Sequence, residues 1–347
     1  MSEAGAKIAT VSKWTAAAVW LYAFGYFAAY LPYSAITKAL TSGFFDGVPK
    51  TTGLMVLPVA ALTSTVGMLV TITALRWWPY AGRRKLGPIS VPFPGIWTFF
   101  SGLATSAIIV TTTLAYTFHG VSIPFIMLLM RGGVLLLAPV VDFLSGRKVS
   151  WFSWIALVLS MLALLDALTQ NKGFAMPLLC VFDIALYLLG YFIRLRFMSR
   201  LAKSEDKAVR LRYFVEEQMV ATPAAVFMLG ILALVGTGPL AEIRMGFTSM
   251  WTSPALPWVI ALGMLSQGTG VFGGLVLLDA RENTFSVPLN RASSILAGVG
   301  AGFALSTFFP KLAHAPHAFE LVGAGLLVFA IVVLWGGPRL RRKKAPG

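Results

Sequence analysis

The feature that most constrains this chain is a series of long apolar stretches separated by short polar segments. Ten stretches approach the length of roughly 20 residues that a helix needs to cross the hydrocarbon core of a bilayer. They cover residues 14–35, 54–76, 96–118, 122–144, 150–168, 174–196, 213–235, 256–278, 285–309 and 318–336. Only 12% of the 347 residues are charged, about half the share in soluble domains. The sequence therefore predicts an all-α polytopic membrane protein with ten transmembrane helices, and it excludes a soluble enzyme.

The basic residues are distributed unevenly among the loops. The formal net charge is +15, which in a soluble protein would suggest a nucleic-acid partner. If the N-terminus is cytoplasmic, 21 of the 28 Lys and Arg residues lie on the cytoplasmic side and 5 lie outside. Lys and Arg favour the cytoplasmic loops of membrane proteins. We therefore expect two cytoplasmic termini and the lipid bilayer as partner rather than nucleic acid, with the basic run 339–344 touching anionic headgroups.

Two short segments recur at nearly the same offset along the chain. Residues 21–27 (LYAFGYF) match residues 186–192 (LYLLGYF) at an offset of 165, and residues 121–124 (VSIP) match residues 285–288 (FSVP) at an offset of 164. These matches indicate that a unit of five spans is duplicated. Because five is odd, the two units have opposite orientations in the membrane. Such inverted repeats are typical of secondary transporters, whose site lies near the midplane between the repeats.

With these features the sequence resembles the drug/metabolite transporter superfamily and, within it, the EamA-like ten-helix transporters. The resemblance rests on the ten spans, the 5+5 inverted repeat, a tight connection at 118–122, and prolines at the start of the fourth and ninth spans, Pro124 and Pro288. Residues 1–170 would form the first repeat and residues 171–347 the second, with its basic tail. The resemblance implies alternating access through a central cavity, peripheral fifth and tenth spans, and a monomer or homodimer.

Ionisable residues deep inside apolar spans are costly to bury and mark candidate functional sites. Arg131 and Asp183 each lie about nine residues into a span, roughly 13 Å from the same outer end. Arg291 follows Asn290 near the start of the ninth span. We predict that Arg131, Arg291 and Asn290 bind substrate. Asp183 is either the partner of Arg131, in an ion pair that locks one state, or a proton-coupling carboxylate.

Tyrosines recur at helical spacing in the two matching segments. Tyr22 and Tyr26 correspond to Tyr187 and Tyr191 in the repeat, and each pair lies on one face of a helix. Tyrosine hydroxyls offer hydrogen bonds, and their rings stack on other rings or on cations. We predict that these four tyrosines line the central cavity, together with Gln267 of the eighth span.

Acidic residues at the ends of spans have a simpler interpretation. Glu216 and Glu217 open the seventh span beside the basic loop, and we predict that they pair with Arg210 and Arg212 at the membrane interface. The same interpretation applies to three acidic residues at other span ends, Asp142, Asp166 and Asp279.

Motifs of enzymes are missing from the sequence: it contains no His-Glu-x-x-His, no Gly-x-Ser-x-Gly and no P-loop. The single cysteine, Cys180, excludes an intramolecular disulfide and a four-cysteine metal site. We therefore expect no enzyme activity, no metal and no cofactor. The absence of an Asn-x-Ser/Thr sequon and the Ala- and Gly-rich composition favour a bacterial inner membrane.

The function predicted from these residues is secondary active transport, or exchange, of a small organic metabolite. Arginines bind carboxylates and phosphates bidentately, so Arg131 and Arg291 favour a substrate with such a group, coupled to a proton or a counter-substrate. Two alternatives remain: an exporter of cationic drugs or amino acids that uses Asp183, and a flippase of an anionic or polyprenyl-linked lipid.

Overall fold

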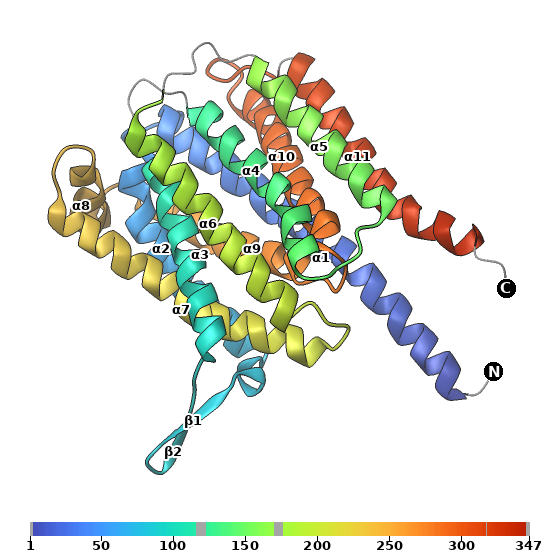
Figure 1. The fold of residues 1–347 in the computed structure, drawn as a ribbon. Coiled ribbons are helices and arrows are strands. Elements are labelled where there is room, and N and C mark those ends of the chain that lie inside the picture. The colour runs from blue at the N-terminus through green and yellow to red at the C-terminus, as the bar shows by residue number, and fades with distance from the viewer. Residues whose placement is uncertain (1–2, 116–122, 170–175, 317, 345–347) are drawn as a thin grey trace.

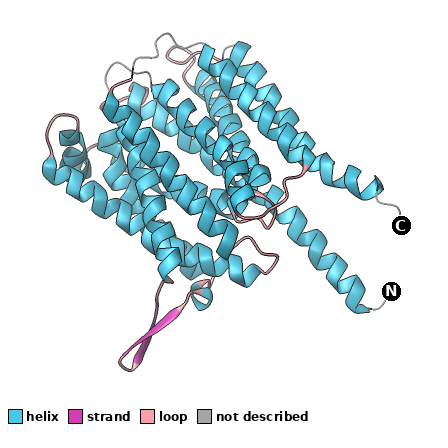
Figure 2. Ribbon diagram, in the orientation of Figure 1, coloured by secondary structure: helices cyan, strands magenta, loops and turns pink. Residues whose placement is uncertain are grey.

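The computed structural model describes residues 3–115, 123–169, 176–316 and 318–344, which are mainly α-helical (Figures 1 and 2). The helices are α1 (Glu3–Ser42), α2 (Gly53–Ala74), α3 (Ile96–Leu114), α4 (Ile123–Leu144), α5 (Trp151–Thr169), α6 (Leu178–Leu201), α7 (Lys207–Val235), α8 (Leu240–Thr248), α9 (Leu256–Leu277), α10 (Asn283–Phe308) and α11 (Ala318–Lys344). The predicted tight turn at 118–122 and the side chains of 339–344 lie outside the described residues.

Each of the ten predicted spans overlaps one long helix, and α8 is an additional short helix. Within the described residues, five segments are long and apolar enough to cross a membrane: Gly53–Ala74, Leu178–Leu201, Lys207–Val235, Leu256–Leu277 and Glu320–Pro338. Large apolar side chains also cover the outside of the bundle, with Phe143 82% and Leu234 81% exposed. Exposed apolar surface of this kind marks contact with membrane or partner, so the prediction of an all-α membrane protein is confirmed.

A β-hairpin interrupts the helical pattern between α2 and α3, after a 3₁₀ turn (Trp78–Tyr80). Strands β1 (Arg83–Leu86) and β2 (Ile89–Pro92) pair antiparallel, with Leu86 opposite Ile89. Gly87 has φ +62°, the positive value that the first central residue of a two-residue hairpin turn requires. The sequence analysis did not predict this hairpin.

Helix contacts made by the first half of the chain recur in the second half, with each helix replaced by its counterpart from the other half. Helix α3 packs against α6 and α7, and α9 packs against α1 and α2. In the same way α4 packs against α6 and α10 packs against α1, while α5 and α11 lie side by side at one edge (Figure 1). The main apolar core lies between these pairs, around Met130 and Leu135 of α4, Leu195 of α6 and Phe214 of α7.

Glycines permit the closest of these helix contacts. A Cβ atom at Gly25 of α1 would lie 2.7 Å from the Phe272 ring of α9, and one at Gly190 of α6 would lie 3.0 Å from Ile108 of α3. Small residues allow membrane helices to approach closely. These positions therefore set the distances between α1 and α9 and between α6 and α3.

Candidate substrate site

A group of buried tyrosines and one arginine lies between α1, α6 and α10. Tyr26 of α1, Tyr187 and Tyr191 of α6, and Arg291 of α10 are all buried. Asp183 is also buried and precedes Tyr187 by one turn, so this face of α6 points inward along its length, as its spacing predicts. The group draws on both predicted repeats.

Arg291 has no acidic partner in this group. Its guanidinium carbon lies 4.9 Å from the centre of the Tyr191 ring, and Tyr26 and Tyr187 lie close enough to interact with it electrostatically. Its buried Nε atom has no hydrogen-bond partner in the structure. The ion pairs among the described residues join other side chains: Arg194 with Glu217, Arg212 with Glu216, and Arg281 with Asp279. Arg291 is therefore a buried cation whose hydrogen-bonding capacity is incompletely used.

Asn290 and Tyr26 meet at one position of α9. The Asn290 side-chain amide donates a hydrogen bond of 3.2 Å to the Gly273 carbonyl. A Cβ atom at Gly273 would lie 3.0 Å from the Tyr26 ring and 3.2 Å from Asn290. This glycine therefore lets α1, α9 and α10 converge beside Arg291.

Arg131 and Asp183 do not form the ion pair that the sequence suggested. Arg131, which is half-buried, donates a hydrogen bond of 3.1 Å to the Tyr30 hydroxyl of α1. Both carboxylate oxygens of Asp183 are buried without a hydrogen-bond partner. Tyr30 thus contacts a predicted site residue, although the sequence analysis did not select it. Its signal was its position one turn after Tyr26, on the same face of α1.

The contacts of Tyr22 and Gln267 lie elsewhere in the bundle. Gln267 of α9 accepts a hydrogen bond of 3.3 Å from Ser64 of α2, and its amide nitrogen is buried without a partner. Tyr22 lines a cavity of about 410 Å³ between α1, α2, α7 and α9, with Lys207 and Arg210 also in its walls. None of the contacts described for Tyr22 or Gln267 reaches Arg291.

A buried ion pair that the sequence analysis missed lies between α6 and α7. Arg194 donates to Glu217 through Nε (2.8 Å) and Nη2 (3.1 Å), and Ser101 and Thr105 of α3 donate to the same carboxylate. The prediction that Glu217 pairs with the interfacial arginines is therefore wrong. For Glu216 the predicted pairing with Arg212 is confirmed, at 2.9 Å, whereas Arg210 donates to the Ser204 carbonyl instead.

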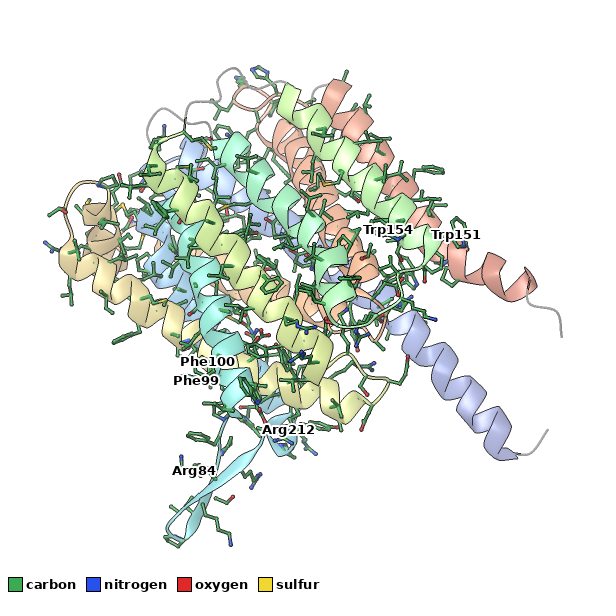
Figure 3. The ribbon with its side chains drawn as sticks, viewed as in Figure 1. Arg84, Phe99, Phe100, Trp151, Trp154 and Arg212 are labelled. Atoms are coloured by element: carbon green, nitrogen blue, oxygen red, sulfur yellow. The ribbon has the colours of Figure 1, made fainter. Side chains whose placement is uncertain are left out.

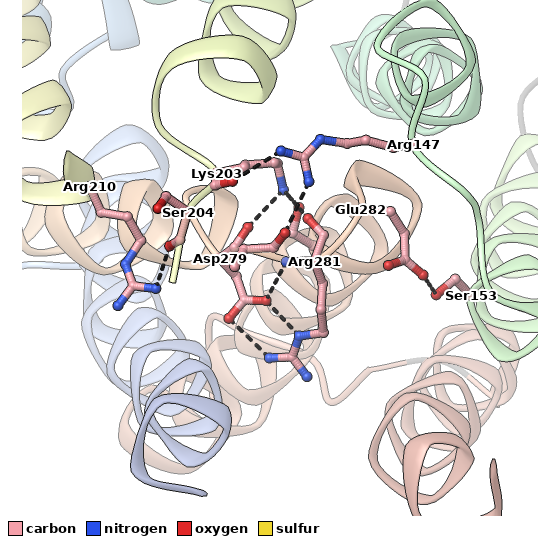
Figure 4. A network of polar contacts seen from close by, with 10 residues as sticks. Arg147, Ser153, Lys203, Ser204, Arg210, Asp279, Arg281 and Glu282 are labelled. Atoms are coloured by element: carbon pink, nitrogen blue, oxygen red, sulfur yellow. Dashed lines mark hydrogen bonds and ion pairs between the residues drawn. The ribbon is translucent and has the colours of Figure 1, made fainter. Parts of the chain in front are cut away.

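A polar network joins the loops at the basic end of the bundle (Figure 4). The Lys203 ammonium donates to the carbonyls of Asp279 (3.1 Å) and Arg281 (2.9 Å) and to the Ser286 hydroxyl (2.9 Å). Burial lowers the pKa of Lys203 to about 8, against the attraction of Asp279 and other carboxylates. Burial would raise the pKa of Asp279, but hydrogen bonds from Arg281 hold that pKa below its usual value.

Asp142 ties the end of α4 to the start of α10. Its carboxylate accepts from the backbone N–H groups of Asn283 (2.8 Å) and Thr284 (2.7 Å) and from both of their side chains. A carboxylate at the first turn of a helix satisfies free N–H groups and complements the helix dipole. Asp142 is fully buried and its described partners are Asn283 and Thr284, so the prediction that it pairs with basic residues is wrong.

Comparison with known proteins identifies a shared fold but no family. No family model and no curated protein matches the chain. A solved structure described as "Crystal structure of protein" matches with a TM-score of 0.57 and 16% identity, over 95% of this chain and 99% of the other. At this identity the match indicates similarity of fold over nearly the whole of both chains.

Proposed function

We propose that the protein is a secondary active transporter of the drug/metabolite type, which moves a small organic anion by alternating access between two inverted five-helix repeats. We place it in a bacterial inner membrane with both termini in the cytoplasm. The observation that carries the proposal is Arg291: a buried arginine, beside three tyrosines, that has no carboxylate partner among the described residues.

The helix contacts support the inverted repeat. Gly25 and Gly190 stand 165 residues apart, and the residues that they contact, Ile108 and Phe272, stand 164 residues apart. These are the two offsets of the sequence matches. The contact of Gly25 in α1 with α9 is thus repeated, with the halves exchanged, by the contact of Gly190 in α6 with α3. A duplicated unit inserted in both orientations accounts for this reciprocity.

The electrostatics support an anionic substrate. A charged side chain inside a membrane span costs up to about 2.5–3.5 kcal/mol on insertion scales, and contact with aromatic rings offsets part of this cost. A carboxylate or phosphate would accept hydrogen bonds from the guanidinium and neutralise it. Arg131 of the first repeat offers a second cation, which donates a hydrogen bond to the neutral Tyr30 hydroxyl. An anion held between α4 and α10 would engage both repeats.

The polar network at the basic end suggests how access is closed there. Asp142 and Arg147 of the first repeat bind backbone and side-chain groups of the second repeat, around Ser199 and Asn283. In the proposed cycle these bonds hold the cytoplasmic ends of α4, α6 and α10 together. They separate when the substrate site opens to that side.

The proposal is tested by ligand-induced stabilisation and by uptake into vesicles with the full chain. Amino acids, carboxylates, sugar phosphates and cationic drugs form the panel. A ligand at about 100 times its Kd stabilises the folded state by about 2.7 kcal/mol. We expect an anion to stabilise the protein and to be transported, and Arg291→Gln to abolish both effects. The control Lys311→Gln changes an exposed cation by the same charge. Stabilisation by cations alone, or anion transport unchanged in Arg291→Gln, refutes the proposal.

Asp183 favours a second candidate, the export of a cationic compound. Its buried carboxylate lacks hydrogen-bond partners, so an organic cation or a proton would satisfy it as an anion satisfies Arg291. Under this candidate Asp183→Asn abolishes stabilisation by cationic drugs, and Arg291→Gln does not affect it.

A further inference from the structure

The β-hairpin is anchored at both of its ends by one buried carboxylate. Glu216 of α7 accepts a hydrogen bond of 2.9 Å from the N–H of Gly82, just before β1, and another of 2.9 Å from the N–H of Gly95, after β2. Thr98 and Arg212 also donate to this carboxylate. Glu216 as a whole is 1% exposed. Hydrogen bonds to Glu216 therefore hold both ends of the hairpin against α7.

The strands of the hairpin carry a cluster of cations away from the bundle. Arg83, Arg84 and Lys85 of β1 are exposed, and no described ion pair involves them. The Arg84 guanidinium lies 5.3 Å from the Phe93 ring, while Ile89 in the turn is 64% exposed. Figure 3 shows Arg84 on the hairpin and Arg212 at its base.

An apolar cavity lies at the base of the hairpin, where a Cβ atom at Gly82 would be 3.3 Å from the Arg212 side chain. It has a volume of about 310 Å³, and its apolar walls include Ile96, Trp97, Leu201 and Val209. Arg212 also lines the cavity, and its side chain is 61% exposed while its Nε binds Glu216. Trp97 is 56% exposed, as is typical of tryptophans at a membrane interface.

We infer that the hairpin and this cavity form a binding site for an acidic phospholipid. The phosphate contacts Arg84 and Arg212, and the first part of an acyl chain lies along Trp97 and Val209. A cationic rim beside an apolar slot fits an anionic amphiphile, whereas free phosphate would leave the slot unfilled. In the proposed orientation the site faces the cytoplasmic leaflet, whose anionic lipids attract basic segments. The inference depends on that orientation but not on transport.

The first experiment measures lipid affinity in nanodiscs that contain the full chain. Phosphatidylglycerol replaces phosphatidylcholine stepwise, and thermal stability reports binding. Two basic residues contribute about 30-fold in affinity near an acidic surface, so Arg84→Gln/Lys85→Gln should shift the midpoint to about 30-fold more phosphatidylglycerol. The control Lys38→Gln/Lys311→Gln removes two exposed cations from the opposite end of the bundle and should leave the midpoint unchanged. Equal shifts in both variants, or equal stabilisation by inorganic phosphate, overturn the inference.

A second experiment locates the lipid independently of stability. Cys180 is buried and is the only cysteine of the chain, so Ser90→Cys, on exposed β2, directs a fluorescent probe to the hairpin. A nitroxide on the phosphatidylglycerol headgroup should quench this probe more than the same nitroxide on phosphatidylcholine. The excess quenching should disappear in Arg84→Gln/Lys85→Gln. Equal quenching by both lipids, or an unchanged excess in the variant, would show that the hairpin has no acidic-lipid site.

Discussion

Arg291→Gln is expected to leave the stability of the ligand-free protein almost unchanged, which is unusual for a substitution at a buried site. An arginine inside a membrane span costs up to about 3 kcal/mol on insertion scales. A desolvated cation–π contact such as that of Arg291 with Tyr191 (4.9 Å) contributes about 2 kcal/mol, and the two side chains also share a hydrogen bond, which contributes about 1 kcal/mol. These contributions nearly cancel, so removal of the charge should change the free energy of unfolding by less than about 1 kcal/mol.

Arg194→Gln provides the matched comparison, because Arg194 of α6 lies one turn after Tyr191. Arg194 is buried, as Arg291 is, but both of its bonds to Glu217 are formed. Breaking a buried ion pair leaves the other charge uncompensated and costs about 3–5 kcal/mol. Arg194→Gln should therefore cost several kcal/mol and Arg291→Gln almost nothing, although each removes one buried positive charge.

The assay uses the thiol of Cys180, which is buried in the folded protein and reacts with a maleimide dye after unfolding. Unfolding curves in detergent give the stabilities of the parent and both variants. If Arg291→Gln lowers stability as much as Arg194→Gln does, Arg291 has a structural partner, and the argument for an anion site fails.

Three further predictions concern the fold and can be measured with the same unfolding assay. Asp142→Ala removes the carboxylate that accepts from the first N–H groups of α10 and leaves buried donors unsatisfied, so we expect a loss of about 2–4 kcal/mol; Asp142→Asn should lose less. Because burial lowers the pKa of Lys203 from 10.5 to about 8, the unfolded chain binds more protons between those pH values. Stability should therefore rise by up to about 3 kcal/mol from pH 8 to 10.5, and a Lys203→Met variant without this rise would confirm the cause. Gly25→Ala places a Cβ atom 2.7 Å from Phe272 and should cost about 1–3 kcal/mol, whereas Gly230→Ala in α7, with nothing within 4 Å, should be neutral or slightly stabilising.

The helices could be predicted from sequence because the bilayer fixes both their length and their composition. An apolar stretch of about 20 residues that crosses lipid forms a helix, because a helix pairs the backbone N–H and C=O groups within the segment itself. The hairpin at Arg83–Pro92 has no such signal: its strands have four residues each and one of them is mainly cationic. Its position depends on Glu216, which lies more than 120 residues later in the chain.

The site was predictable as a set of residue types, and only partly as a set of contacts. Helical spacing placed Asp183, Tyr187 and Tyr191 on one face of α6, and that face is buried. Depth within a span did not identify the partner of Arg131, because two residues at equal depth meet only if both helices turn them toward each other. Arg131 meets Tyr30 of α1 instead. Glu217 likewise has its partners on α3 and α6, which no local pattern connects.

The buried charged side chains in the described part of the bundle form two groups: those with hydrogen-bond partners and those with unpaired polar atoms. The second group should be tested first for function. Asp142, Glu217 and Arg194 are buried with several hydrogen bonds each, so their role is accounted for by the fold. Among the charged residues described, Asp183 and Arg291 alone have buried polar atoms without a partner. Such groups reduce stability and are retained where a ligand or another conformation completes them. Because one is an anion and the other a cation, substituting each in turn distinguishes a cationic from an anionic substrate.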